Sequence, residues 1–127
     1  MAAFEINCYF FPFSQIFISH FTNSEIFQNL YISHSKNDQS LSIPSSVTKV
    51  QKNTFYEYLS LTQITIPNSI TSIGDGAFFD CASLTQISIP SSVISIGDHV
   101  FDSCPSLTQI TIQSSVTEIG EGAYHWC

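Results

Sequence analysis

Three acidic residues recur at one interval and are the first candidates for chemistry. Asp75, Asp98 and Glu121 follow one another at steps of 23 residues. In a stacked β structure they would lie about 5 Å apart, and carboxylates at that separation could bind a cation such as calcium. The dense carboxylates of a calcium-binding loop are missing. We therefore favour the alternative, in which each acid caps a short helical turn of its own repeat.

Three cysteines repeat at the same interval. Neighbours among Cys81, Cys104 and Cys127 would lie about 5 Å apart, within disulfide range. An interval of 23 residues matches neither a C-x-x-C redox pair nor a zinc ligand set, so we favour buried, reduced thiols that pack as small apolar groups. His99 and His125 lack metal-ligand spacing, and no Gly-x-Ser-x-Gly motif is present. We predict no catalytic residue, no metal and no cofactor.

Neutral polar residues form a further pattern. The residues expected to point away from the core are Gln63, Thr65, Gln86, Ser88, Gln109 and Thr111. Stacked, they would form two columns of hydrogen-bonding groups on a concave face, and such faces of solenoids often bind partners. We predict that this face binds a protein, with a glycan as a second option. The alternative is a solvated sheet face without a ligand.

Charge and composition exclude several functions. The 127 residues carry a net charge of −7 with only three Lys and no Arg, which excludes a basic nucleic-acid surface and argues against docking on anionic lipid. The 17 Ile with 21 Ser and 10 Thr predict β structure. Residues 8–18 are too short an apolar stretch to span a bilayer, which needs about 20 residues. The first 35 residues contain no Lys or Arg, so no signal peptide is predicted.

A 23-residue repeat positions all the candidate residues. Full copies occupy residues 41–63, 64–86 and 87–109, and a partial fourth begins at residue 110. Residues 1–40 fit no copy and hold 7 of the 11 Phe, so we interpret them as a decayed repeat or an N-terminal cap. We predict two units, this segment and a repeat domain of residues 41–127. Without a polar cap, the last coil is expected to offer a surface for self-association.

Each copy encodes one coil. Ile87 and Ile89 would point to the same side of a strand because strand side chains alternate. Gly97 would permit a turn with positive φ, and Asp98 would N-cap a short helical turn that carries Phe101 inward. One coil cannot bury its own apolar edge, whereas stacked coils can. The spacing therefore predicts a solenoid with a β-strand and a short helical turn per coil.

The repeat unit resembles a known family. Residues 81–101, CASLTQISIPSSVISIGDHVF, are similar to the BspA-like leucine-rich repeat, and the likeness covers residues 41–127. The first copy departs from the pattern with Gln51 and Tyr58 in place of Gly and Cys, and the last has Gln113 in place of Pro. The resemblance implies a right-handed, curved leucine-rich repeat solenoid without enzymatic activity or a shared cofactor. It also implies adhesion-type binding at a cell surface or in secretions.

These observations together predict a non-enzymatic, protein-binding module. It would be a surface or secreted adhesion-type leucine-rich repeat protein that binds a host or matrix protein through its concave strand face. The location is implied by the resemblance alone, since no signal peptide or transmembrane segment is visible. An intracellular leucine-rich repeat scaffold and a partial fragment of a longer repeat protein are the alternatives.

Overall fold

Stacked coils make up the described part of the molecule. The computed structural model describes residues 37–127, so the predicted N-terminal unit of residues 1–40 lies almost wholly outside the described residues. Each coil carries one strand of three or four residues and one of two residues. The strands are β1 (Ser40–Ser42), β2 (Lys49–Val50), β3 (Gln63–Thr65), β4 (Ser72–Ile73), β5 (Gln86–Ile89), β6 (Ser95–Ile96), β7 (Gln109–Ile112) and β8 (Glu118–Ile119).

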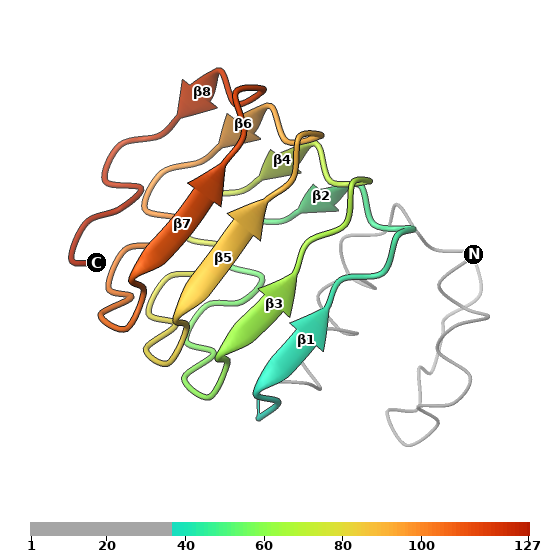
Figure 1. Cartoon of the computed structure of the whole chain (residues 1–127). Coiled ribbons are helices and arrows are strands. Elements are labelled where there is room, and N and C mark those ends of the chain that lie inside the picture. The colour runs from blue at the N-terminus through green and yellow to red at the C-terminus, as the bar shows by residue number, and fades with distance from the viewer. Residues whose placement is uncertain (1–36) are drawn as a thin grey trace, which may run out of the picture.

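Equivalent strands of successive coils pair in parallel. β1 pairs with β3 and β5 with β7, while β2, β4, β6 and β8 form a second, continuous sheet. Between the two pairs, β3 and β5 lie side by side (Figure 1). In the β5–β7 pair, Ile87 lies opposite Ile110 and Ile89 opposite Ile112, which confirms the 23-residue register. The long strands form one wall of the solenoid and the short strands form the other (Figure 1).

One apolar cluster fills the space between the two walls. In the third copy, the residues expected to be buried are buried, namely Ile87, Ile89, Phe101 and Cys104, and Val93, Ile96 and Leu107 are buried with them. Inside the cluster, four rings stack in one column, with centroid separations of 5.0, 5.5 and 5.8 Å from Phe55 through Phe78 and Phe101 to Tyr124. Full burial of one such side chain contributes about 1.5–3 kcal/mol, so this cluster is the main stabilising feature of the stack.

The short helical turn predicted in each coil is not formed. Residues 98–103 form consecutive turns, and residues 37–127 contain no helix. The N–H groups of His99 and Phe101 donate to the carbonyls of Glu121 and Ala123 in the next coil, at 2.9 and 2.8 Å. An N–H used in this way cannot close an intrahelical bond, and the φ of 53° at His99 lies outside the right-handed helical region. Hydrogen bonds between coils therefore replace the helix.

Gly97 has a different role from the one expected. Positive φ among the glycines occurs at Gly76 and Gly122, and not at Gly97. A Cβ at Gly97 would lie 2.7 Å from the backbone nitrogen of Asp75 and 2.9 Å from the carbonyl carbon of Gly74. Glycine is required at this position because the adjacent coil passes too close for any side chain.

Within residues 37–127, no helix is both long enough and apolar enough to cross a bilayer.

Candidate binding face

The residues predicted to bind a partner lie together on the outer side of the long strands. All six are exposed, namely Gln63, Thr65, Gln86, Ser88, Gln109 and Thr111. The strand register places Gln86 beside Gln109 and Ser88 beside Thr111. The same columns continue onto β1, where Ser40 pairs with Gln63. We call the outer side of β1, β3, β5 and β7 the polar strand face.

Side chains on the polar strand face are free to bond a ligand. Among the described residues, none of the six forms a side-chain hydrogen bond. The threonines just before these strands behave differently, because their hydroxyls donate to carbonyls of the preceding coil. Thr62 bonds Gln39 at 2.8 Å, and Thr108 bonds Thr85 at 3.3 Å. The chain thus uses one threonine column to join its coils and leaves the amides and hydroxyls of the face open.

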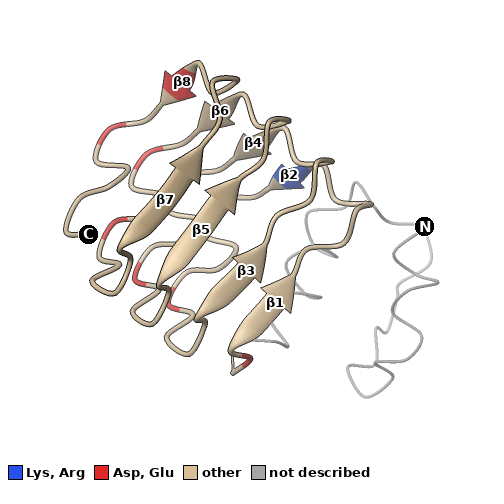
Figure 2. Ribbon diagram, in the orientation of Figure 1, with Lys and Arg blue, Asp and Glu red and all other residues tan. Residues whose placement is uncertain are grey.

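The polar strand face carries no charge. Figure 2 shows β1, β3, β5 and β7 without acidic or basic residues, whereas charged residues lie on the short strands and in the turns. Lys49 stands on β2 and Glu118 on β8. Recognition at the neutral face would depend on hydrogen bonding and shape, with little electrostatic steering of the encounter.

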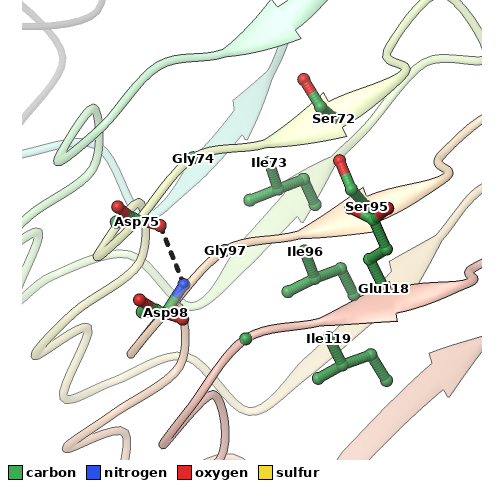
Figure 3. Close-up of a pocket in the computed structure, with 11 residues that line it drawn as sticks. Ser72, Ile73, Gly74, Asp75, Ser95, Ile96, Gly97, Asp98, Glu118 and Ile119 are labelled. Carbon is green, nitrogen blue, oxygen red and sulfur yellow. Dashed lines mark hydrogen bonds between the residues drawn. The ribbon is translucent and has the colours of Figure 1, made fainter.

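Asp75, Asp98 and Glu121 lie at equivalent positions of successive coils, and we call them the acidic column. Its aspartates join each coil to the next. One carboxylate oxygen of Asp75 accepts the N–H of Asp98 at 2.9 Å (Figure 3), and Asp98 in turn accepts the N–H of Glu121 at 2.8 Å. The expectation that each acid caps its own repeat was therefore wrong, since each aspartate caps the next coil. A groove of about 430 Å³ passes this column along Gly74 and Gly97. Within residues 37–127, no three His, Cys, Asp or Glu residues are grouped to hold a metal ion.

Substitution of one aspartate in the acidic column distinguishes a capping role of its carboxylate from a calcium-binding role. We expect Asp98→Ala to lower the free energy of unfolding by about 1 kcal/mol, because the N–H of Glu121 loses its acceptor. Asp98→Asn keeps an oxygen acceptor and should cost less. Denaturant titrations with and without calcium measure both effects. A calcium-dependent rise in wild-type stability that Asp98→Asn abolishes would contradict the capping role.

The three repeated cysteines form a column of hydrogen-bonded thiols. Cys81, Cys104 and Cys127 are free, and each Sγ donates to a carbonyl of the preceding coil. The acceptors are Phe55 at 3.2 Å and Phe78 at 3.1 Å for the first two thiols. Burial, above all, raises the pKa of Cys81 and of Cys104 to about 12, which leaves almost no reactive thiolate at neutral pH.

Burial of the thiols predicts an order of reactivity. With iodoacetamide at pH 8, Cys127 should be labelled well before Cys81 and Cys104, because it alone of the three is exposed. Site-resolved mass spectrometry gives the rates, and labelling in concentrated guanidinium provides the reference for unfolded thiols. Equal rates at Cys104 and Cys127 in the native chain would contradict the buried column.

An imidazole–carboxylate cluster was missed by the sequence analysis. The side chains of His99 and His125 are about half exposed, at 51% and 56%, and both face Asp102. Asp102 is the one buried charged residue among those described. A signal was present in the sequence, because the equivalent positions in the first two coils are Tyr56 and Phe79. A carboxylate in an otherwise aromatic column needs partners, and the two histidines supply them.

Comparisons with known proteins agree with this geometry. Residues 5–127 of the chain match the family described as "BspA type Leucine rich repeat region (6 copies)". None of the curated proteins compared with the chain matches it.

Several solved structures share the fold. A leucine-rich cell surface protein from Faecalibacterium prausnitzii is 36% identical with a TM-score of 0.67, over 72% of this chain and 28% of its own. A leucine-rich repeat protein from Bacteroides ovatus is 32% identical with a TM-score of 0.63, over 70% of this chain and 29% of its own. The leucine-rich repeat protein of T. pallidum is 29% identical with a TM-score of 0.58, over 70% and 55% of the two chains. The chain thus spans about a quarter to a half of the length of these proteins.

Proposed function

Because the chain belongs to the family of BspA-type leucine-rich repeats, we propose that it is a non-enzymatic module that binds a host or matrix protein through the polar strand face. Repeats of this kind generally mediate protein interactions and act as non-enzymatic scaffolds. The observation that carries the proposal is the set of six exposed, unbonded polar residues aligned on three neighbouring strands. The strands that carry these residues are paired with their neighbours, so the backbone of the face is already ordered before a partner binds.

A surface or secreted location is part of the proposal. It is supported by the likeness to the F. prausnitzii protein, which is described as a cell surface protein. Labelling of intact source cells with a membrane-impermeant biotin reagent tests it. Biotinylation of the chain on intact cells, or its recovery from the medium, is expected. Detection only after lysis would contradict this location and favour an intracellular scaffold.

Binding is tested with charge placed on and off the face. The probes are plates coated with purified extracellular-matrix proteins, and intact epithelial cells. The face variant is Gln86→Arg with Gln109→Arg, and the matched control is Ser91→Arg with Ser114→Arg, which adds the same charge to exposed turn positions of neighbouring coils. We expect the face variant to bind at least tenfold more weakly and the control to stay within twofold of wild type. No binding by wild type, or equal loss in both variants, would refute the proposal.

Self-association is a second proposal, supported by the surface of the fourth coil. Ile119 is 51% exposed, whereas Ile73 and Ile96, its equivalents in the preceding coils, are 2% exposed. The N–H groups of Tyr124 and Trp126 also lack an acceptor among the described residues, although the equivalent groups in the third coil donate to the fourth. The exposed Ile119 side chain and these N–H donors all belong to the fourth coil, which therefore offers a surface for packing against a second copy.

Sedimentation velocity over a dilution series tests self-association. Wild type should form concentration-dependent dimers or larger species, and Ile119→Glu should sediment as a monomer. Ile94→Glu is the matched control, since Ile94 is similarly exposed at 54% but lies in the third coil. A monomeric wild-type chain, or loss of association with Ile94→Glu as well, would refute this proposal.

A further inference from the structure

Asp102 connects the third coil to the fourth through its carboxylate. The side chain is only 9% exposed, and its oxygens contact His99 Nδ1 at 3.0 Å, Ser103 Oγ at 3.0 Å and His125 Nδ1 at 3.5 Å. His99 and Ser103 belong to the same turn as Asp102, whereas His125 belongs to the turn of the fourth coil. The carboxylate is therefore shared across the boundary between two coils.

The ionisation state of Asp102 determines how strongly its carboxyl group holds the imidazole rings of His99 and His125. Burial by itself raises the pKa of this carboxyl, but hydrogen bonds from Ser103, His99 and His125, together with the nearby His125 ring, outweigh burial and lower the pKa. Hydrogen bonds to an ionised carboxylate are stronger than those to a neutral group. Once Asp102 is protonated, its carboxyl group is neutral and those hydrogen bonds weaken.

Other titratable residues lie near the cluster, but none of them takes over the role of the Asp102 carboxylate. The thiols of Cys104 and Cys127 interact electrostatically with Asp102. Asp80 of the second coil donates its backbone N–H to the carbonyl of Asp102 at 2.9 Å. The thiols stay neutral in acid, and the bond from Asp80 involves only main-chain atoms. Of these groups, Asp102 is the one whose titration changes the contact with His125.

We propose that His99, Asp102 and His125 form an acid-sensitive clasp that holds the turn of the fourth coil on the third. A carboxyl group whose folded pKa is depressed stabilises the folded state above its unfolded pKa, about 3.9, and loses that contribution as the pH falls through the folded value. The clasp is therefore closed at neutral and mildly acidic pH and opens in stronger acid. The second coil has no such cluster, because Phe79 occupies the equivalent position.

Hydrogen exchange measured residue by residue tests the clasp between pH 6 and pH 3. The reporters are the amides of Phe101 and Ser103, which donate to carbonyls of the fourth coil, and the references are the equivalent amides of Phe78 and Asp80. After correction for intrinsic exchange rates, we expect the protection of the reporters to fall about threefold more than that of the references by pH 3, because a depressed pKa is titrated only in part at that pH. A parallel fall in all four amides would overturn the proposal, because it would mean global acid unfolding.

Two variants assign the effect to the carboxylate. Asp102→Phe introduces the aromatic residue found in the second coil and should remove the extra loss of protection at pH 3. Asp98→Asn changes the other aspartate that bonds the fourth coil, and this variant should still show the extra loss of protection at pH 3. His99→Gly introduces the residue found at the equivalent positions Gly76 and Gly122. This variant should show a smaller extra loss of protection at pH 3. Unchanged acid sensitivity in Asp102→Phe, or its loss in Asp98→Asn, would refute the clasp.

Discussion

Phe101→Ala should remove about 3–5 kcal/mol from the free energy of unfolding, one of the two largest effects that we expect in this chain. Phe101 has no exposed surface, and its ring stacks between Phe78 at 5.5 Å and Tyr124 at 5.8 Å. Truncation loses the transfer free energy of the ring and leaves a cavity in the middle of the column. Because whole domains are stable by only about 5–15 kcal/mol, the variant should be close to unfolding at room temperature. Denaturant titration followed by circular dichroism measures the loss.

Tyr124→Phe is the matched control for the ring column. The hydroxyl of Tyr124 is buried without a hydrogen-bond partner among the described residues, so its removal should be neutral or slightly stabilising. Loss of less than about 1 kcal/mol in Phe101→Ala would show that the column does not stabilise the stack. A large loss in Tyr124→Phe would show that the hydroxyl has a partner.

Gly97→Ala should destabilise the chain by about 3 kcal/mol, at the upper end of the cost of overpacking. The new methyl group would meet the backbone of the preceding coil at Gly74 and Asp75, and backbone cannot move aside as a flexible side chain can. The shift would also strain the bond from the Gly97 N–H to the carbonyl of Ile73, now 2.8 Å long. Thermal unfolding measures the effect.

Ser95→Ala is the control for Gly97→Ala. Ser95 lies two residues earlier on β6 and is partly exposed, so the substitution should change stability by less than about 0.5 kcal/mol. The double variant Gly97→Ala with Asp75→Ala removes the side chain of Asp75 but leaves the close backbone. It should not recover wild-type stability. Recovery would show that the Asp75 side chain, and not the backbone, requires glycine at position 97.

Regular spacing explains why the coil and its core could be predicted from the sequence. Ile87 and Ile89 alternate as strand residues, and Phe101 recurs at the 23-residue interval, so their burial follows from periodicity alone. The polar strand face follows from the same alternation, which also predicted the exposure of Gln86 and Ser88. Whether that face binds a protein depends on a partner, about which periodicity contains no information.

Contacts between coils explain what the sequence analysis missed. β6, at Ser95–Ile96, has only two residues and exists because β4 and β8 pair with it, so no local pattern reveals it. The turn at residues 98–103 is not helical because its N–H groups bond the next coil. We predicted a positive φ at Gly97. Glycine is required there for another reason, because the backbone of the preceding coil leaves no space for a Cβ. Each of these features depends on a neighbour 23 residues away.

The polar strand face is tested most directly by a photo-crosslinker placed on it. Benzoylphenylalanine at Gln86 would lie on the face, and the same residue at Ser91 would lie at an exposed turn of the same coil. Each chain is irradiated on solubilised extracellular matrix and on intact epithelial cells, and adducts are identified by mass spectrometry. We predict a discrete protein adduct from position 86 and none from position 91. Equal adducts from both positions, or an adduct from position 91 alone, would contradict binding through the strand face.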